Sequence, residues 1–167
     1  CDCISDVSSS HLLNGARRPS LDISDLQRII LDPQPATERL RALVELVVRK
    51  AGQSRNNWHL RVLAAEILAP SPHGQAHLQA DRPLKLALLN GLFSDITGIP
   101  VDDPALVPSI LCVTAPWAML LIGPRGPSSS LHAILGMPVE AVSAQLYTFA
   151  LAGLQAVGHQ YTQAKGH

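Results

Sequence analysis

The sequence predicts an all-helical fold, and three observations support this prediction. Apolar side chains recur at intervals of three and four residues along several stretches, as they do on one face of an α-helix. Proline and glycine separate these stretches and mark where helices begin and end. No segment alternates apolar and polar residues for long enough to predict a strand. We therefore expect one helical domain over residues 21–167, preceded by residues 1–20, which are irregular or the remnant of an earlier helix.

Proline and glycine residues delimit the first predicted helices. Residues 24–31 form a short helical candidate that stops before Pro33, and residues 35–51 form a stronger one. The second stretch is stronger because its apolar residues form a single stripe while charged residues fill the other side. A third helix is expected over residues 57–69, whose first residue is an asparagine, a favoured N-cap. The stripe of the second stretch consists of Leu40, Leu43, Val44, Val47 and Val48.

The middle of the chain predicts longer and more apolar helices. Residues 73–97 predict a long helix with a kink or break at Pro83. At residues 103–104, a capping aspartate followed by proline predicts the start of a helix that continues to about residue 122. This helix is apolar on almost every side, so we expect it to be buried on most sides. The prolines expected to bend it are Pro108 and Pro116.

Length and charge limit the function classes that fit this chain. Its 167 residues suffice for one hydrophobic core, and a hydrophobic content of 47% argues against disorder. Lys plus Arg and Asp plus Glu both number 13, which gives a net charge of zero. Because domains that bind nucleic acids usually carry a basic excess, the composition argues against direct binding of DNA or RNA by this chain.

Cysteine usage and hydropathy favour a cytoplasmic protein with no membrane contact. Three cysteines without framework spacing favour a reduced compartment. The polar first residues do not resemble a signal peptide, and the longest apolar run, residues 115–122, is too short to cross a bilayer. Since the chain starts with Cys1 rather than Met, we expect it to be a fragment of a longer protein.

Three motifs resemble one family of transcriptional regulators. Residues 58–72, W-H-L-R-V-L-A-A-E-I-L-A-P-S-P, resemble the W-H-L-R-x-L-x-x-E-x-L-x-P-S-P stretch of the C-terminal domain in the CecR-like branch of the TetR family. Arg82-Pro83 resembles the R-P that this branch places inside a long helix, and residues 99–104 resemble its G-L-x-x-D-D-P connection. The resemblance covers roughly residues 35–122. It implies a helical regulatory domain in which a small effector binds among the central helices and the two last long helices pair with a partner subunit.

The resemblance also implies a repressor that releases operator DNA when its effector binds. TetR proteins read DNA through a helix-turn-helix module with a Y-x-x-F-x-x-K-like signature at its end. That module should precede the matching region, and no such run is found in this sequence. We therefore expect contact with operator DNA only through the missing module of the intact protein, together with a homodimer and an unknown small-molecule effector.

Six residues are candidates for binding the effector. Trp58 can stack on a ligand, although it can equally anchor a helix start in the core. Arg61 and Glu66 are charges in an otherwise apolar stretch, and each can orient a polar ligand group or form a separate ion pair between helices. Three further candidates lie on the apolar helix, where they can line a pocket wall or belong to an ordinary core: Cys112, Trp117 and Met119.

The last predicted helix, from Pro138 to about Gln163, follows a short helical turn at residues 131–135 and predicts a dimer contact. A helix-interior glycine costs about 1 kcal/mol relative to alanine. Gly153 and Gly158 therefore suggest close packing, inside one subunit or between two. The apolar part of this helix is wider than a single packing face requires. We therefore predict that this helix and the helix at residues 104–122 form a four-helix bundle with the same two helices of a second copy. The predicted interface residues are Leu146, Phe149, Ala150, Gly153, Ala156 and Val157.

Catalytic and metal-binding patterns are weak. His73, His77 and Asp81 share one helical face with spacing that can bind zinc, but histidines on a solvated face are common, and we expect no metal or cofactor. The serines at residues 128–130 with His132 form a polar loop rather than a nucleophile elbow, so we expect no enzyme. The open alternatives are a helical dimer that acts as an interaction module, and a small-molecule carrier or minor enzyme that uses the two histidines.

Overall fold

The computed structural model describes residues 23–53, 82–123 and 126–166. Every regular element among these residues is an α-helix, so the all-helical prediction is confirmed for this part of the chain. The predicted helix at residues 57–69 and residues 73–81 of the next one lie outside the described residues. The helices are α1 (Ile23–Ile30), α2 (Ala36–Gln53), α5 (Arg82–Thr97), α6 (Leu106–Ile122), α7 (Ser130–Leu135) and α8 (Val139–Lys165).

The start of α6 differs in detail from the sequence prediction. The first residue of α6 is Leu106, two residues after Pro104. The reason is a turn: Oδ1 of Asp103 accepts the N–H of Ala105 at 2.9 Å, and its carbonyl accepts the N–H of Leu106 at 3.0 Å. Pro83 is the second residue of α5 (Arg82–Thr97), and the residues before Arg82, which decide whether the predicted helix kinks or breaks there, lie outside the described residues.

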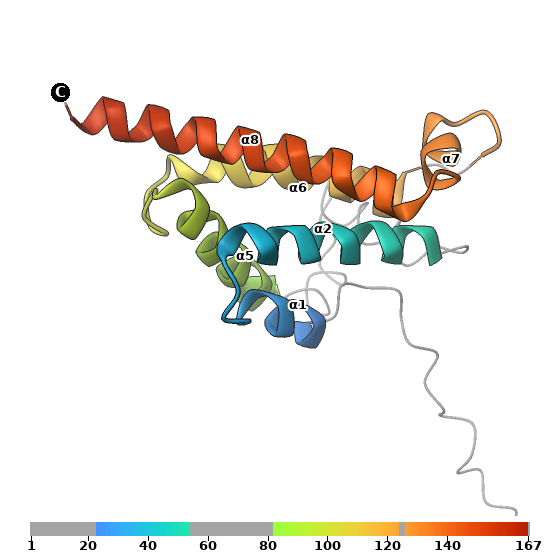
Figure 1. Ribbon diagram of the computed structural model, residues 1–167, viewed down its shortest axis with the longest axis horizontal. Coiled ribbons are helices and arrows are strands. Elements are labelled where there is room, and N and C mark those ends of the chain that lie inside the picture. The colour runs from blue at the N-terminus through green and yellow to red at the C-terminus, as the bar shows by residue number, and fades with distance from the viewer. Residues whose placement is uncertain (1–22, 54–81, 124–125, 167) are drawn as a thin grey trace, which may run out of the picture.

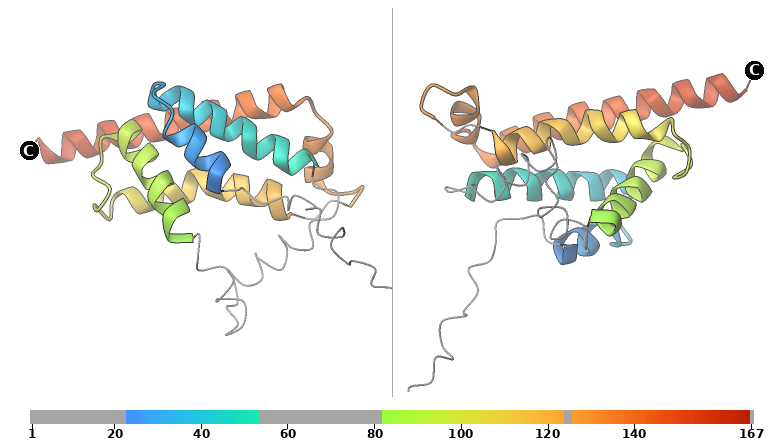
Figure 2. Two further views of the ribbon diagram at one scale, coloured as in Figure 1. Left: turned by 90° about the horizontal axis from the view of Figure 1, so that it is seen from below. Right: turned by 180° about the vertical axis from the view of Figure 1, so that it is seen from behind.

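Helix α2 lies at the centre of the described fold. It packs on both α6 and α8, which run in opposite directions (Figure 1, Figure 2). Its predicted apolar stripe is confirmed, because the stripe residues are buried in the core together with Ala51. Burying one such side chain contributes roughly 1.5–3 kcal/mol, so this stripe is the main source of the packing energy of α2.

Arg39 of α2 fastens α1 and α5 to the central helix. One guanidinium nitrogen donates to the carbonyl of Ile30 at 2.8 Å, and Nε donates to the carbonyl of Gln34 at 3.1 Å. The other terminal nitrogen forms an ion pair with Asp95 of α5 at 2.8 Å. Since the last carbonyls of a helix have no partner within it, the contact with Ile30 caps α1. A half-exposed ion pair such as that with Asp95 contributes little by itself.

The predicted burial of α6 on most sides is wrong for the described structure. Val107, Leu111 and Met119 are each more than half exposed. The reason is that α6 contacts the described helices α2, α5 and α8 on only part of its circumference, while apolar side chains lie on almost every side of it. Pro108 lies in the first turn, where it displaces no hydrogen bond, whereas Pro116 lies inside the helix.

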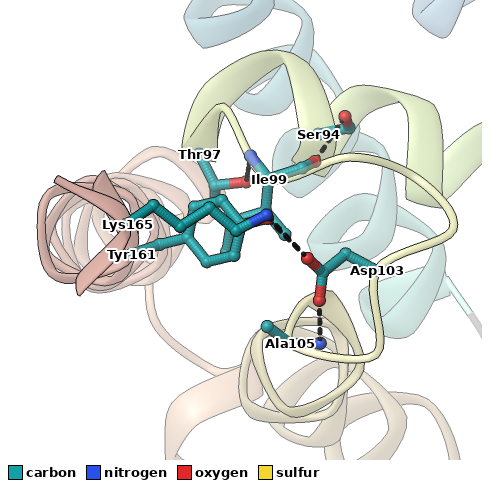
Figure 3. Close-up of polar contacts among 7 residues, drawn as sticks. All are labelled: Ser94, Thr97, Ile99, Asp103, Ala105, Tyr161 and Lys165. Carbon is teal, nitrogen blue, oxygen red and sulfur yellow. Dashed lines mark hydrogen bonds and ion pairs between the residues drawn. The ribbon is translucent and has the colours of Figure 1, made fainter. Parts of the chain in front are cut away.

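The turn between α5 and α6 is fixed by side chains and one glycine (Figure 3). The hydroxyl of Thr97 donates to the carbonyl of Phe93 at 2.8 Å and accepts the N–H of Ile99 at 3.2 Å. Gly98 has a φ of 71°, a left-handed conformation that glycine adopts without strain. The Ser94 hydroxyl donates to the carbonyl of Ile99 at 2.6 Å. Together these contacts place the fully buried Ile99 in the core.

The C-terminal end of α8 is attached to this connection through Asp103 (Figure 3). Its Oδ2 accepts the hydroxyl of Tyr161 at 2.5 Å and lies 3.5 Å from Nζ of Lys165, which also lies 4.5 Å from the centre of the Tyr161 ring. The pKa of Asp103 is lowered below its ordinary value of 3.8. The main cause is the hydrogen bond from Tyr161, followed by the hydrogen bond from Ala105 and the positive charge of Lys165.

We predict that acid weakens this junction. Because the pKa of Asp103 is lower in the folded state than in the unfolded chain, its contribution to the free energy of unfolding is fully present above pH 3.8. The contribution is lost as the pH falls through the folded pKa. Asp103→Asn should therefore lower the free energy of unfolding at neutral pH and reduce its acid dependence, as measured by urea denaturation across pH. Asp102→Asn, at the exposed neighbouring position, is the control. Identical unfolding curves for Asp103→Asn and wild type at every pH would contradict this role.

Candidate functional site

An apolar groove of about 270 Å³ lies between α6 and α8 and is partly open to solvent. Each helix contributes residues spaced by about one turn, so a single face of each helix forms one wall. No wall residue carries a charge, and the polar side-chain atoms among them are the thiol of the exposed, free Cys112 and the indole nitrogen of Trp117. The α6 wall consists of Cys112, Val113, Pro116 and Trp117, and the α8 wall of Leu146, Phe149, Ala150 and Gly153.

The floor of the groove belongs to the hydrophobic core. Trp117 is only 5% exposed, and its ring lies 6.4 Å from that of Phe93 on α5, with an angle of 58° between the ring planes. Aromatic pairs with this tilted geometry are favourable beyond the area they bury. Beside it, Pro116 cannot donate the backbone hydrogen bond that would reach the carbonyl of Cys112. The groove therefore has a buried aromatic floor, and the backbone of one of its walls lacks a helical hydrogen bond.

The outer surface of the same two helices is exposed and uncharged. We define the α6–α8 face as six exposed residues that are spaced four and then three residues apart on each helix. Phe149 and Met119 on this face are 71% and 54% exposed. Helix α6 contains no charged residue, and α8 contains none between Glu140 and Lys165. The six residues are Cys112, Pro116, Met119, Phe149, Gly153 and Ala156.

The exposed side of α2 provides the contrast. It carries Glu38, Arg41, Glu45 and Arg49, which form ion pairs along the helix surface. A helix that faces water normally presents such a polar side, and α2 does so although its other side is fully buried. Lack of charge is therefore a property of α6 and α8 rather than of the whole chain, and it distinguishes their outer surface from an ordinary solvated one.

The structure brings together residues that the sequence analysis had assigned to two different sites. Cys112 and Trp117, expected to bind an effector, line the same groove as four residues expected at a dimer contact. Met119 and Ala156 lie on the exposed face above it. Sequence reasoning missed two wall residues, Val113 and Pro116, because periodicity cannot select one face of a helix that is apolar all round. The effector candidates Trp58, Arg61 and Glu66 lie outside the described residues.

The two apolar stripes of α8 have different environments. Ala150, Leu154 and Tyr161 belong to the stripe that packs inward, and Val157 of the same stripe is packed against the core. Ala150 and Val157, although named as interface residues, therefore contact their own subunit, and Ala150 reaches the groove only at its floor. The other stripe faces the groove or solvent, although Leu146, which lines the groove, is also partly buried against the core: Leu146, Phe149, Gly153, Ala156 and Gln160.

The two glycines predicted to mark close packing of α8, Gly153 and Gly158, lie in different surroundings. A Cβ atom at Gly158 would lie within 2.3 Å of the carbonyl oxygen of Thr97, so this glycine lets α8 approach the end of α5. A Cβ atom at Gly153 would meet no atom of the described chain within 4 Å. Close packing inside one subunit therefore explains Gly158 and leaves Gly153, on the exposed face, without such an explanation.

We predict opposite effects of alanine at these two positions on the stability of the isolated subunit. Gly153→Ala should raise the free energy of unfolding by up to about 1 kcal/mol, because alanine is the better helix former and meets open space. Gly158→Ala should lower it by roughly 1–3 kcal/mol, because the added methyl overlaps the Thr97 carbonyl. Chemical denaturation at low protein concentration measures both changes. Shifts of the same sign for the two variants would contradict the assignment.

Other candidate sites find little support in the described part of the chain. Within it, no group of three or more His, Cys, Asp or Glu side chains is placed to hold a metal ion. His73, His77 and Asp81 lie outside the described residues. The polar loop before α7 has a capping role, since the Ser129 hydroxyl accepts the N–H of Leu131 at 3.2 Å. None of the described helices combines the length and apolarity needed to cross a membrane.

Comparison with known proteins gives no match: no protein-family model and no curated protein sequence matches this chain. The resemblance to the TetR branch therefore rests on the sequence motifs. The fold and the groove by themselves define a broader class, a helical protein with an uncharged apolar face on two antiparallel helices.

Proposed function

We propose that this chain is the effector-binding and dimerisation domain of a TetR-type transcriptional regulator. The α6–α8 face is the observation that carries the dimerisation half of the proposal. The motifs at residues 58–72, 82–83 and 99–104 support the regulator half. In the intact protein, effector binding would change the angle between helices and thereby release operator DNA from helix-turn-helix modules that are encoded outside this chain.

The character of the α6–α8 face favours a second copy of the chain as partner. A contact across a two-fold axis places the same surface on both sides, so any charge near the axis meets its own like charge. An uncharged face avoids this repulsion. Two antiparallel helices from each copy would form a four-helix bundle, and every exposed apolar side chain on the face would be buried twice, once in each subunit.

The effector half of the proposal depends on the resemblance. Of its candidate residues, Cys112 and Trp117 line the groove, which opens toward the proposed partner. A dimer that fills this groove leaves no room there for an effector, so the effector site would be formed by other residues of the central helices. An interaction module that dimerises without any effector is the second candidate, because the α6–α8 face supports it equally well.

We predict that the wild-type chain is a dimer at micromolar concentration and that Gly153→Glu is monomeric. The glutamate meets open space within its own subunit, so the subunit should fold, whereas the dimer would bring two carboxylates into one apolar contact. Light scattering during size-exclusion chromatography measures the mass. Gln155→Glu adds the same charge at an exposed position of α8, turned by about 120° from Phe149, and should remain dimeric. A monomeric wild type, or a dimeric Gly153→Glu, would refute the interface.

A melting-temperature screen distinguishes an effector-binding domain from an interaction module that binds no effector. We expect at least one small aromatic or amphipathic compound to raise the melting temperature in a concentration-dependent way, because a ligand that binds only the folded state stabilises it by mass action. At a concentration of 100 times Kd this amounts to about 2.7 kcal/mol. A dimer that no compound in a broad panel stabilises would favour the interaction module.

A further inference from the structure

We infer that the Phe149 ring of each copy inserts against Gly153 of a second copy and closes the partner's α6–α8 groove. The inference rests on the proposed dimer and specifies which residue completes the groove. Phe149 lies on the edge of the groove and is 71% exposed, the most exposed of the large hydrophobic side chains in the described chain. An aromatic ring with this much surface in water is a strong candidate for an anchor at an interface.

The recess lies one helical turn away from the ring. Gly153 forms part of the same groove and leaves open space where a side chain would stand. The groove has a volume of about 270 Å³, and an apolar cavity of about 150 Å³ already accepts a benzene ring. A phenylalanine ring from outside therefore fits, and it would contact walls that are uncharged and mainly apolar.

The order of side chains along α8 fits an antiparallel pair of α8 helices. If the two-fold axis crosses α8 at the level of residue 151, on the side of the helix away from the core-packed Leu151 side chain, residues equally far on either side of that level lie opposite each other across the contact. Phe149 then faces the partner's Gly153, and the part of Leu146 that is exposed in the groove, beside its contact with the core, faces the partner's Ala156. Both are pairs of one large and one small side chain, which lets the helices approach closely without a void or a clash. A partner of a different sequence would have to supply this spacing independently.

A size exchange between the two positions tests the pairing. Phe149→Gly removes the ring and Gly153→Phe fills the recess, so each single variant should weaken dimerisation by about 30-fold or more, the effect of losing an interface anchor. The double variant Phe149→Gly/Gly153→Phe restores a large-to-small pair in both halves of the symmetric contact and should recover most of the affinity. Sedimentation equilibrium gives the dissociation constants, and circular dichroism verifies that every variant is helical.

A photocrosslinker gives a second measurement that keeps the aromatic ring. Benzoylphenylalanine at position 149, in a mixture of isotopically heavy and light chains, should give intermolecular adducts on the partner's peptide around Gly153 or on its wall from Cys112 to Trp117. If the wild type is dimeric but the adducts lie elsewhere, the pairing is overturned and the dimer stands. The same holds if the double variant dimerises no more tightly than the single variants. A monomeric wild type would overturn both.

Discussion

The buried stripe of α2 is the contact on which the packing of α1, α5, α6 and α8 depends. Its apolar residues are enclosed by these four helices, so all of them pack against the same surface. Arg39 on the same helix fixes α1 and α5 through two backbone carbonyls and Asp95, and Lys50 pairs with Asp25 of α1 at 3.3 Å. Because the stripe fills only one side of α2, charged residues occupy its other side and that side needs no partner.

The side of α8 that faces the core is set by contacts between the C-terminal end of α8 and the α5–α6 connection. Both stripes of α8 are apolar enough to be buried in a core. Hydrophobic contact with α2 alone therefore does not determine which stripe faces α2. The approach of Gly158 to the Thr97 carbonyl and the hydrogen bond from Tyr161 to Asp103 select one of them. As a result, Phe149 and Gly153 point outward beside α6. The polar junction at the α5–α6 connection therefore decides which surface is free to bind a partner.

The groove and the face above it combine two properties that are seldom found together on a solvated surface: large exposed apolar side chains, and a lack of charge along α6 and along α8 between Glu140 and Lys165. Burial of such a surface is favourable in proportion to its apolar area and has no directional requirement of its own. Its specificity must then come from shape. The ring of Phe149 and the open space at Gly153 provide that shape, and this is why the proposed contact depends on the order of large and small residues more than on their hydrophobicity.

The sequence by itself determined the helical class, the helix bounds to within about two residues where they are described, and the buried stripe of α2. These features follow from local rules: proline and glycine punctuation, capping residues, and a period that separates apolar from charged positions. The sequence also showed that α8 carries two apolar stripes and that α6 is apolar all round. It could not decide which stripe faces inward or which side of α6 is exposed, because periodicity carries information only where apolar and polar residues alternate. Tertiary contacts decided both, and they joined Trp117 of one predicted site to Phe149 of another. These residues are distant in the chain, and only the antiparallel packing of α6 and α8 on α2 brings them to the same groove.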